Sequence, residues 1–252
     1  MSGGVVAVVA HPDDEALIAG GTLALAADRG LKTGVVSLTR GELGPISDRK
    51  LADERTLGSV RERELHASGE ILGVGWTRCL CWPDGELEWA DTAAVVAEVV
   101  ELLGPAPPAV LLTFGEDGLY GHRDHVATWL VAVAAGALLG SSVYEAVWSP
   151  ELAGDLVAAA RERGLPASLW GLEPEAFGSA EAGAACCTRV DVRGVLHRKL
   201  AALRAHATQL DPGHLLAALP ADLAAAYLGD ETWRRADERA PDVLGELLGR
   251  DG

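Results

Sequence analysis

The residues best suited to chemistry are His11, Asp13, Asp14 and Glu15, which surround Pro12 in one short stretch. An imidazole and carboxylates in such a cluster can bind a metal ion or transfer protons. They directly follow the apolar run of residues 5–10, at a predicted strand-to-helix turn. Turn chemistry does not require this cluster, and like charges repel unless a cation lies among them, so a divalent metal ion is the natural candidate.

A second cluster, Gly121-His122-Arg123-Asp124-His125, follows another apolar run at residues 109–114. In an open parallel sheet, ligands bind at the carboxyl ends of the strands, so both clusters are expected at one edge. A hydrolytic zinc site typically takes three protein ligands and keeps a fourth position for water. His11, Asp14 and either His122 or His125 would complete such a set. Taken alone, each cluster has a plainer interpretation, as a helix cap or a helix-start pair, but together they favour a metal site.

Apolar strands alternate with amphipathic helices through the first half of the chain. This alternation predicts an α/β fold, a Rossmann-like three-layer sandwich with a mainly parallel central sheet. We expect strands at residues 5–10, 33–39, 77–82 and 109–114, and helices at residues 15–28, 51–72, 92–103 and from about residue 122.

The second half carries a weaker pattern. It predicts strands at residues 142–148 and 188–192, and helices at residues 195–210 and 222–238. The Gly/Ala/Pro-rich interval 149–185 is interpreted as a capping or mobile segment. Because no internal repeat or low-complexity linker interrupts the chain, we predict a single domain over residues 1–252.

Composition excludes several functions. The 252 residues include 21 Lys and Arg against 37 Asp and Glu, so the formal net charge is −16. This disfavours nucleic acids and anionic membrane surfaces as partners, since both need a basic footprint. The longest apolar stretch, residues 126–139, is shorter than the roughly 20 residues of a membrane span, and no secretory leader is expected. We therefore expect a cytoplasmic protein. Its cysteines, Cys79/Cys81 and Cys186/Cys187, lack zinc-site spacing and are interpreted as free thiols.

The same clusters resemble a known family, the LmbE-like, PIG-L type zinc-dependent N-acetylglucosaminyl deacetylases. Residues 10–15 match its A-H-P-D-D-E signature without a gap, and residues 121–125 match its G-H-x-D-H block. Most of the chain is covered, although residues 149–185 are not. Supporting matches are the T-x-G-E loop at residues 39–42, the R-x-x-E-L helix at 61–65, the P-D-G turn at 83–85 and the A-H-x-S-Q segment at 205–209, where Thr208 replaces the usual Ser.

The resemblance implies roles for individual residues. His11, Asp14 and His125 would bind Zn²⁺, although Fe²⁺ suits the same ligands. Asp13 would act as the general base, His122 as a protonated partner and Asp124 as the residue that orients His122. The remaining implied positions are Tyr120, which would help polarise the substrate carbonyl, and Glu42, Arg61 and Asp84, which would contact sugar hydroxyls. For Arg61, a solvent-exposed helix charge is an equally weighted alternative, and the role of His206 stays open.

The predicted function is a metal-dependent hydrolase that removes an acyl group, acetyl in the first instance, from the amide nitrogen of a small amino-sugar compound. A competing enzyme class is a non-haem Fe(II) oxygenase, whose H-x-D…H triad His11, Asp13 and His125 would satisfy. A non-catalytic sugar-binding relative is the alternative of a different class. The expected partner is a small N-acylated amino-sugar substrate, and a homo-oligomer is left open. The leaving group and the exact substrate are not readable from the metal-site residues.

Overall fold

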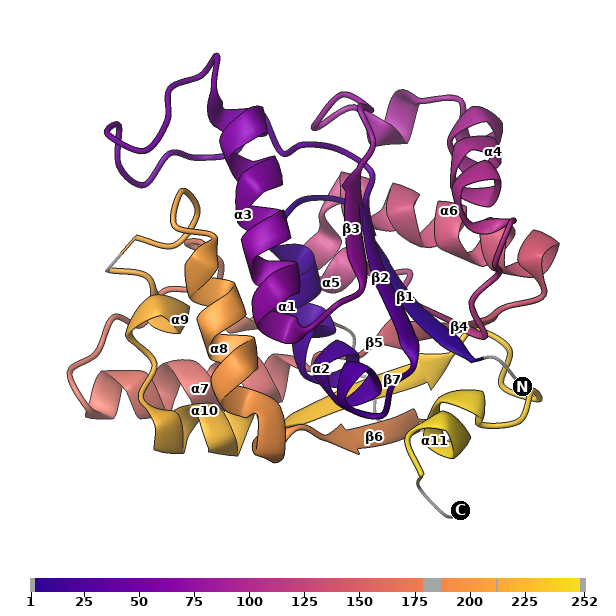
Figure 1. Ribbon diagram of the computed structural model, residues 1–252. Helices are drawn as coiled ribbons and strands as arrows, with labels where there is room; N and C mark the ends of the chain where they lie inside the picture. The colour runs from indigo at the N-terminus through magenta and orange to yellow at the C-terminus, as the bar shows by residue number, and fades with distance from the viewer. Residues whose placement is uncertain (1–2, 179–186, 212, 250–252) are drawn as a thin grey trace.

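The computed structural model describes residues 3–178, 187–211 and 213–249. Their strands form one seven-stranded sheet in the order β3-β2-β1-β4-β5-β7-β6 (Figure 1). The strands are β1 (Gly4–Val9), β2 (Lys32–Ser37), β3 (Trp76–Cys79), β4 (Val110–Thr113), β5 (Ser142–Ala146), β6 (Cys187–Asp191) and β7 (Asp230–Arg235).

The first five strands of this order run parallel, whereas β7 is antiparallel to both of its neighbours. Strand β1 lies between β2 and β4, and the chain leaves it first toward β2 and later returns to its other side. Such a change of direction opens a crevice beyond the carboxyl ends of the two strands. The predicted clusters at residues 11–15 and 121–125 follow β1 and β4, so the topology brings them to this crevice.

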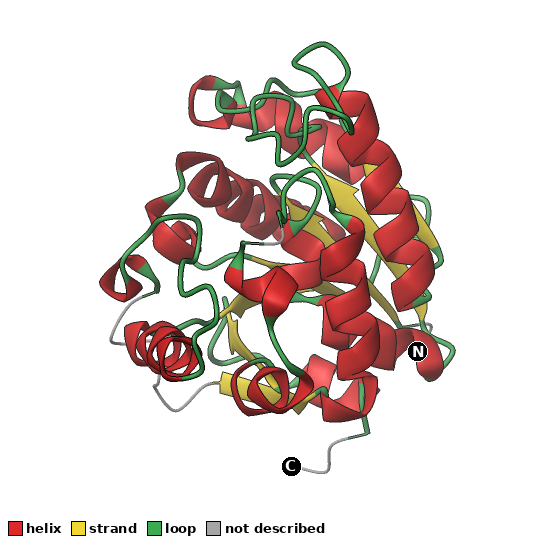
Figure 2. Cartoon of the chain, turned by 90° about the vertical axis from the view of Figure 1, so that its left-hand side faces the viewer, coloured by secondary structure: helices red, strands yellow, loops and turns green. Residues whose placement is uncertain are grey.

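Helices cover both faces of the sheet (Figures 1 and 2). On one face, α2 (Gly20–Asp28), α3 (Leu57–Leu72) and α8 (Leu196–Ala205) pack against one another, and α4 (Thr92–Leu103) packs on α6 (Arg123–Leu139) on the other. The predicted α/β sandwich with a mainly parallel sheet is thus confirmed. The remaining helices are α1 (Asp14–Ile18), α5 (Gly118–Gly121), α7 (Pro150–Glu162), α9 (Leu215–Ala218), α10 (Ala221–Tyr227) and α11 (Val243–Leu247), with 3-10 turns η1 (Leu87–Trp89), η2 (Pro174–Ala176) and η4 (Arg193–Val195).

The helix predicted over residues 15–28 is two helices, α1 and α2, which meet at Ala19. Ala19 has φ −128° and ψ −2°, outside the helical region. The break places the first N–H groups of α2 within reach of the buried carboxylate of Glu231, which accepts hydrogen bonds from Gly21 and Thr22 at 2.8 Å. A Cβ on Gly21 would lie 2.4 Å from Val192, so this close approach also requires glycine.

The helix predicted over residues 222–238 is wrong in its second half. Only α10 is helical, and residues 230–235 form β7 between β5 and β6. The burial of β7 alternates, with Glu231 and Trp233 facing the interior. Alternating burial is typical of a half-buried strand. The sequence does not reveal this pattern, because one of the buried positions carries a glutamate.

The interval 149–185, interpreted as a capping or mobile segment, contains α7 and η2 in its described part. Ser149 caps α7 by accepting a hydrogen bond from Leu152 N–H, and Pro150 follows at the first helical position. Residues 179–185 lie outside the described residues, as does Cys186. The described part is therefore largely regular, with Trp170 in a turn after α7.

Glu231 is also paired with Lys199 of α8, whose Nζ lies 2.7 Å from Oε1, and both side chains are no more than 3% exposed. The carboxylate thus receives two backbone N–H groups and one ammonium in the interior. Breaking a buried pair by removing one partner typically costs about 3–5 kcal/mol, because the remaining charge is left uncompensated.

We therefore expect Lys199→Met to lower the free energy of unfolding by about 3–5 kcal/mol, measured by chemical denaturation. Lys199→Met/Glu231→Gln should recover part of this loss, since Gln removes the uncompensated charge and keeps an acceptor for α2. Lys32→Met is the matched control, because Lys32 is exposed. An unfolding midpoint for Lys199→Met equal to that of the wild type would contradict this account.

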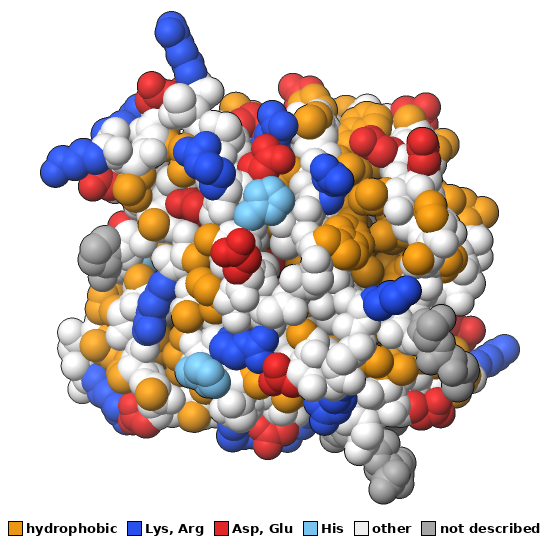
Figure 3. Space-filling view, in the orientation of Figure 1, with side chains coloured by type: hydrophobic (Ala, Val, Ile, Leu, Met, Phe, Trp, Pro, Cys, Tyr) orange, Lys and Arg blue, Asp and Glu red, His pale blue; other side chains and the backbone are white. Residues whose placement is uncertain are grey.

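No helix among the described residues is long and apolar enough to cross a membrane. On the face drawn in Figure 3, acidic and basic side chains are interspersed, so this face has no continuous basic surface for nucleic acid. Cys79 is buried and Cys81 exposed, and both are free thiols as expected. Burial raises the pKa of Cys79 to about 12, which makes its thiol unreactive.

Candidate active site

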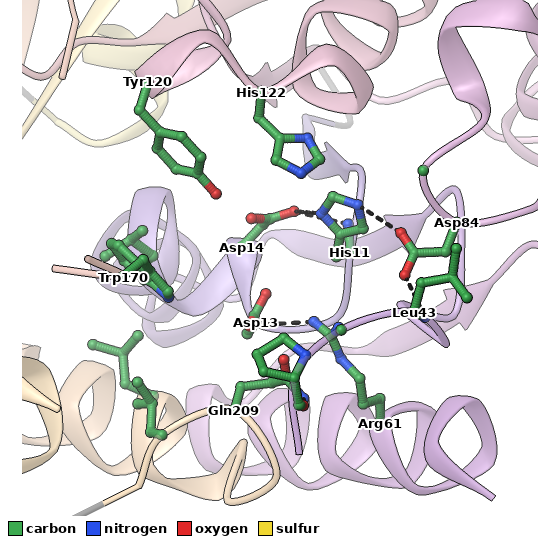
Figure 4. A pocket seen from close by; sticks show the side chains of 16 residues that line it. His11, Asp13, Asp14, Leu43, Arg61, Asp84, Tyr120, His122, Trp170 and Gln209 are labelled. Atoms are coloured by element: carbon green, nitrogen blue, oxygen red, sulfur yellow. Dashed lines mark hydrogen bonds and ion pairs between the residues drawn. The ribbon is translucent and has the colours of Figure 1, made fainter. Parts of the chain in front are cut away.

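A cavity of about 310 Å³ opens beyond the carboxyl ends of β1 and β4 (Figure 4). Three elements supply its polar floor: the turn after β1 gives His11, Asp13 and Asp14, α3 gives Arg61, and the segment after β4 gives His122. We call this space the inner cavity. Its wall also includes Asp84, Tyr120, Trp170 and Gln209, together with apolar residues such as Leu17 and Leu203.

Three predicted ligands come together at the floor. Donor atoms of His11, Asp14 and His125 lie within 4.8 Å of one another, and all three residues are buried. Asp14 is central: its Oδ2 is 3.4 Å from His11 Nδ1, and its Oδ1 is 3.4 Å from His125 Nε2. The residue types alone left either His122 or His125 as the third ligand. Of these two, the group of close donor atoms includes His125.

The surroundings of His125 fix the orientation of its ring and leave the lone pair on Nε2. Its Nδ1 donates to the carbonyl of Gly118 at 3.1 Å, and its ring stacks on Phe114 with centroids 3.9 Å apart. Burial lowers the pKa of His125 to about 3, so the imidazole is neutral. Among the described residues, nothing forms a hydrogen bond with its buried Nε2. An orphaned acceptor beside a carboxylate is what a metal ligand requires, so this donor set fits a divalent metal ion.

His11 is surrounded by acids on its other side. Its Nε2 lies 3.1 Å from Asp84 Oδ1 and 3.3 Å from Asp124 Oδ2. Burial alone would lower the pKa of His11, but Asp124, Asp14 and Asp84 together raise it above the ordinary value. A carboxylate on the far nitrogen of a metal-binding histidine fixes the tautomer and the ring orientation. Asp84 and Asp124 thus leave His11 Nδ1 facing Asp14.

Asp124 was expected to orient His122, but the hydrogen bond between the two residues involves only the main chain of Asp124. The N–H of Asp124 donates to His122 Nδ1 at 3.3 Å, with His122 as the N-cap of α6. The carboxylate of Asp124 instead contacts His11 and accepts hydrogen bonds from Gly85 N–H (2.7 Å) and Leu87 N–H (3.1 Å). Its principal side-chain contact is therefore with a candidate metal ligand.

The proton on His122 is placed by this cap. Because Nδ1 accepts a hydrogen bond, Nε2 carries the proton and can donate into the inner cavity. Burial and the neighbouring His11 lower the pKa of His122. The neutral ring is thus favoured over the protonated one that the family resemblance implied.

Asp13 stands apart from the ligand cluster. Its Oδ2 is 3.2 Å from Arg61 Nη2, and its side chain lines the inner cavity (Figure 4). Asp13 occupies the N-cap position of α1, but its side chain makes no capping hydrogen bond. Burial raises its pKa to about 6, and Arg61 opposes that shift. A carboxyl group with a pKa near neutrality and a face toward a cavity can act as a general base.

The backbone of Asp13 is held in an uncommon conformation, with φ +125°. Non-glycine residues adopt such values at a cost of about 1–3 kcal/mol, and only where the surroundings enforce them. Glu15 contributes to this enforcement, because its Oε2 accepts the N–H of Asp13 at 3.0 Å. Glu15 is itself fully buried and held by His206 Nε2 at 2.8 Å and by Ser68 Oγ. His206, whose role the sequence left open, thus supports the turn that carries Asp13.

Arg61 is 3% exposed, which excludes the alternative of a solvent-exposed helix charge. Its guanidinium donates to the carbonyls of Gly41 (2.8 Å) and Pro12 (2.6 Å) and pairs with Asp13. Arg61 therefore joins the two loops that border the inner cavity and also lies in its wall.

The other two predicted sugar contacts, Asp84 and Glu42, differ in whether they line the inner cavity. Asp84 lies in the cavity wall, and its carboxylate contacts His11 and accepts Leu43 N–H at 2.8 Å. Glu42 is absent from the described wall of the inner cavity, and its Oε1 accepts Asp84 N–H at 3.1 Å. Tyr120, by contrast, faces the inner cavity as expected (Figure 4), and burial raises its pKa, so that the phenol keeps its proton.

Several contributors were not anticipated. The ring of Phe114 stacks on that of His125. Gln209 joins two walls of the inner cavity by donating a hydrogen bond to Pro45 O at 3.0 Å. Trp170 forms one side of the same cavity. Gln209 belongs to a motif already noted at residues 205–209, so it was within reach of sequence reasoning. Trp170 lies in the interval that no motif covers, where only its residue type gave a signal.

Comparison with known proteins identifies the family of this chain. The family model described as PIG-L, GlcNAc-PI de-N-acetylase, matches residues 6–136, which include both clusters. The 1D-myo-inositol 2-acetamido-2-deoxy-alpha-D-glucopyranoside deacetylase of Corynebacterium glutamicum (strain R) is 36% identical over 229 residues, covering 82% of this chain and 74% of the relative.

Solved structures show the same fold at lower identity. N,N'-diacetylchitobiose deacetylase from Pyrococcus horikoshii superimposes with a TM-score of 0.63 at 22% identity, over 95% of this chain and 87% of that one. The hydratase GalB from Pseudomonas putida, which acts on 4-carboxy-2-hydroxymuconate, gives 0.62 at 18% identity, over 95% and 98%. Since one fold serves two reactions, the fold alone does not fix the chemistry. The family match and the sequence relatives do more: this chain belongs to the PIG-L family of de-N-acetylases.

Proposed function

We propose that this protein is a zinc-dependent deacetylase that removes the acetyl group from the amide nitrogen of a small N-acetylglucosamine glycoside. His11, Asp14 and His125 would hold the ion. Bound there, zinc would supply Lewis acidity toward the amide carbonyl and a lowered pKa for water. The oxygenase alternative, which needs Asp13 in the ligand set, finds no support, because Asp13 pairs with Arg61 instead.

The protein's own groups divide the remaining work. Asp13 accepts the proton of the attacking water, since its raised pKa suits a base near neutrality. His122 Nε2–H and the Tyr120 hydroxyl are the donors available to the developing oxyanion, and one well-placed donor is typically worth roughly 3 kcal/mol. Arg61 holds Asp13 in place and keeps it from drifting into the ligand set. After attack, Asp13 is also placed to return its proton to the leaving nitrogen.

The substrate class follows from the relatives and from the inner cavity. The relative from Corynebacterium glutamicum is named for an inositol glycoside of N-acetylglucosamine. A cavity of about 310 Å³ lies at the lower end of the usual range for ligand sites. It suits one sugar ring, with Asp84 and Arg61 as polar wall groups. We also infer that residues 1–252 act as one catalytic domain, because loops from both halves line this cavity.

One observation carries the proposal: the buried Nε2 of His125 lies beside Asp14 without a hydrogen-bond partner among the described residues, and Asp13 stays outside this cluster. The test is to incubate the zinc-loaded protein with a panel of N-acetylated glycosides and to measure free amine and acetate. We expect equal amounts of both products, loss of turnover after chelation, and recovery on adding zinc.

Parallel reactions distinguish the alternatives. Loading with Fe²⁺ in place of Zn²⁺ identifies the metal that supports turnover, and exclusion of oxygen tests the oxygenase class. Binding of the glycosides without release of amine under any metal would identify a non-catalytic sugar-binding relative and would refute the proposed reaction.

A further inference from the structure

A second cavity, of about 550 Å³, lies at the end of the sheet opposite the inner cavity. Its lining includes the first residues of three parallel strands, Gly4 of β1, Lys32 of β2 and Trp76 of β3, together with the proline-rich loop of residues 105–108 after α4. We call this space the basal cleft. No described residue lines both the basal cleft and the inner cavity, so the two are separate.

The basal cleft uses one face of the sheet. Trp76 pairs with Gly34 of β2, and a Cβ on Gly34 would lie 2.3 Å from the indole, so the ring lies across this glycine. Side chains two positions apart on a strand point to the same face, which places Lys32 of β2 and Arg78 of β3 on the same face as the indole. The indole is therefore flanked by two cations, one toward each end of the strands.

The outer side of Trp76 is left open, and the side chain remains 39% exposed. Its strand β3 is an edge strand, and among the described elements β2 and α3 pack most closely against it. In the view of Figure 3, apolar side chains gather around a hollow between the positions that β3 and α4 occupy in Figure 1, with basic side chains at its border. Apolar surface left open in a concave region is typical of a binding site.

The charge of the basal cleft is opposite to that of the chain. The formal net charge of the chain is −16, yet the described lining contains Lys32 and Arg78 and no Asp or Glu. Neither of these two side chains forms a hydrogen bond or an ion pair with another described residue. Because an acidic surface repels anions elsewhere, this cleft is where the protein can attract one.

A plainer interpretation explains only part of this arrangement. A charged residue on an edge strand keeps other chains from pairing with it, and Arg78 can serve in this way. Lys32, however, lies on β2, which has a partner strand on either side. Protection of an edge also requires no cavity, whereas the basal cleft falls within the usual range of about 300–1,000 Å³ for sites that bind small molecules.

We propose that the basal cleft binds a small aromatic anion, whose flat ring packs on Trp76 and whose charge is attracted by Lys32 and Arg78. The exposed indole offers a planar apolar contact surface, and the two unpaired cations select for negative charge. This inference does not depend on the proposed function, because the cleft lies at the opposite end of the strands from the residues assigned to catalysis.

The test compares two probes of the same shape: 2-naphthoate, which is an anion, and its neutral amide, 2-naphthamide. Calorimetric titration of the zinc-loaded protein measures both dissociation constants. We expect the wild type to bind the anion about tenfold more tightly than the amide, the combined worth of two exposed charge pairs. Lys32→Gln/Arg78→Gln should abolish this preference and leave the affinity for the amide unchanged. Trp76→Leu keeps an apolar cover for Gly34 and should weaken the binding of both probes about fivefold.

Lys50→Gln/Arg55→Gln is the matched control, because both residues are exposed and neither lines the basal cleft or the inner cavity. Nuclear Overhauser effects between naphthyl protons and the Trp76 indole test the stacking in the wild type without any substitution, and their absence would contradict it. No binding of either probe, equal affinities for both, or an anion preference that survives in Lys32→Gln/Arg78→Gln would overturn the proposal. Naphthoate bound at the metal site would give the last of these results, and its binding would be lost on chelation of zinc.

Discussion

Replacing Asp13 with Asn is expected to lower kcat by about two to four orders of magnitude while the zinc content stays at the wild-type level. The amide of Asn cannot accept the proton of water, but it keeps the shape of the side chain. Asp13 pairs with Arg61 and lies outside the group of His11, Asp14 and His125, so its loss removes no candidate ligand. Steady-state release of amine and elemental analysis of the same preparation measure the two quantities.

The pH dependence gives an independent check. Because the ionised carboxylate is the form that accepts a proton, the kcat/KM of the wild type should fall as the pH decreases, and burial places the pKa of Asp13 unusually high. Asp155→Asn is the matched control, because Asp155 is an exposed residue of α7 to which no role in the site is assigned. Full turnover by Asp13→Asn would remove the assigned base, and loss of zinc from it would make Asp13 a ligand.

The placement of Asp13 illustrates how much of the site was readable in the sequence. Strands β1 and β4 are short, mostly apolar and fully buried, so their ends could be predicted from the sequence, and the parallel order brings those ends together. Residue types alone then predicted a metal cluster at that edge. The sequence and the family resemblance also predicted Asp14 as the ligand and Asp13 as the base. They did not predict the geometry that keeps Asp13 apart, which is the φ of +125° at Asp13 and the contact with Arg61 from α3.

Strand β7 shows why part of the fold escaped prediction. Its sequence, Asp-Glu-Thr-Trp-Arg-Arg, follows an alanine-rich helix and looks like a polar continuation of it. The strand is stable because Glu231 finds Lys199 and the N–H groups of α2, which come from far along the chain. Local propensity carries no information about such a partner. The break at Ala19 was missed for the same reason, because it brings the first N–H groups of α2 to the distant carboxylate of Glu231.

The contact between Trp170 and His214 marks a further limit of sequence-based prediction. Trp170 and His214 are separated by 44 positions, and neither falls in a recognisable motif. Their juxtaposition depends on the turn after α7 and the cap of α9 meeting in space. Substrate choice often resides in such loops, which vary while the catalytic floor is fixed by the sheet.

Removal of His125 should have the second large effect, and it acts on the metal rather than on the proton transfer. We expect His125→Gln to weaken zinc binding by more than about 100-fold, beyond the 10–100-fold typical when a residue that only supports a ligand is lost. The reason is local: Gly118 O orients the ring, Phe114 stacks on it, and Nε2 is thereby aimed at Asp14. Competition against a chelator of known affinity measures the loss, and activity should fall in proportion to bound zinc.

The informative comparison is with the neighbouring histidine. His122→Asn keeps an acceptor for Asp124 N–H at the start of α6 but removes the Nε2–H donor. If His122 stabilises the oxyanion and does not bind the ion, this variant should retain zinc and lose turnover by about 100-fold or more. Equal loss of zinc from both variants would place both imidazoles on the metal. Retention of zinc by His125→Gln would instead move the ion to the opposite side of His11, between Asp84 and Asp124, the other described cluster able to hold one. The pair of measurements therefore locates the ion on one side of His11 or the other, and with it the side from which the amide must approach.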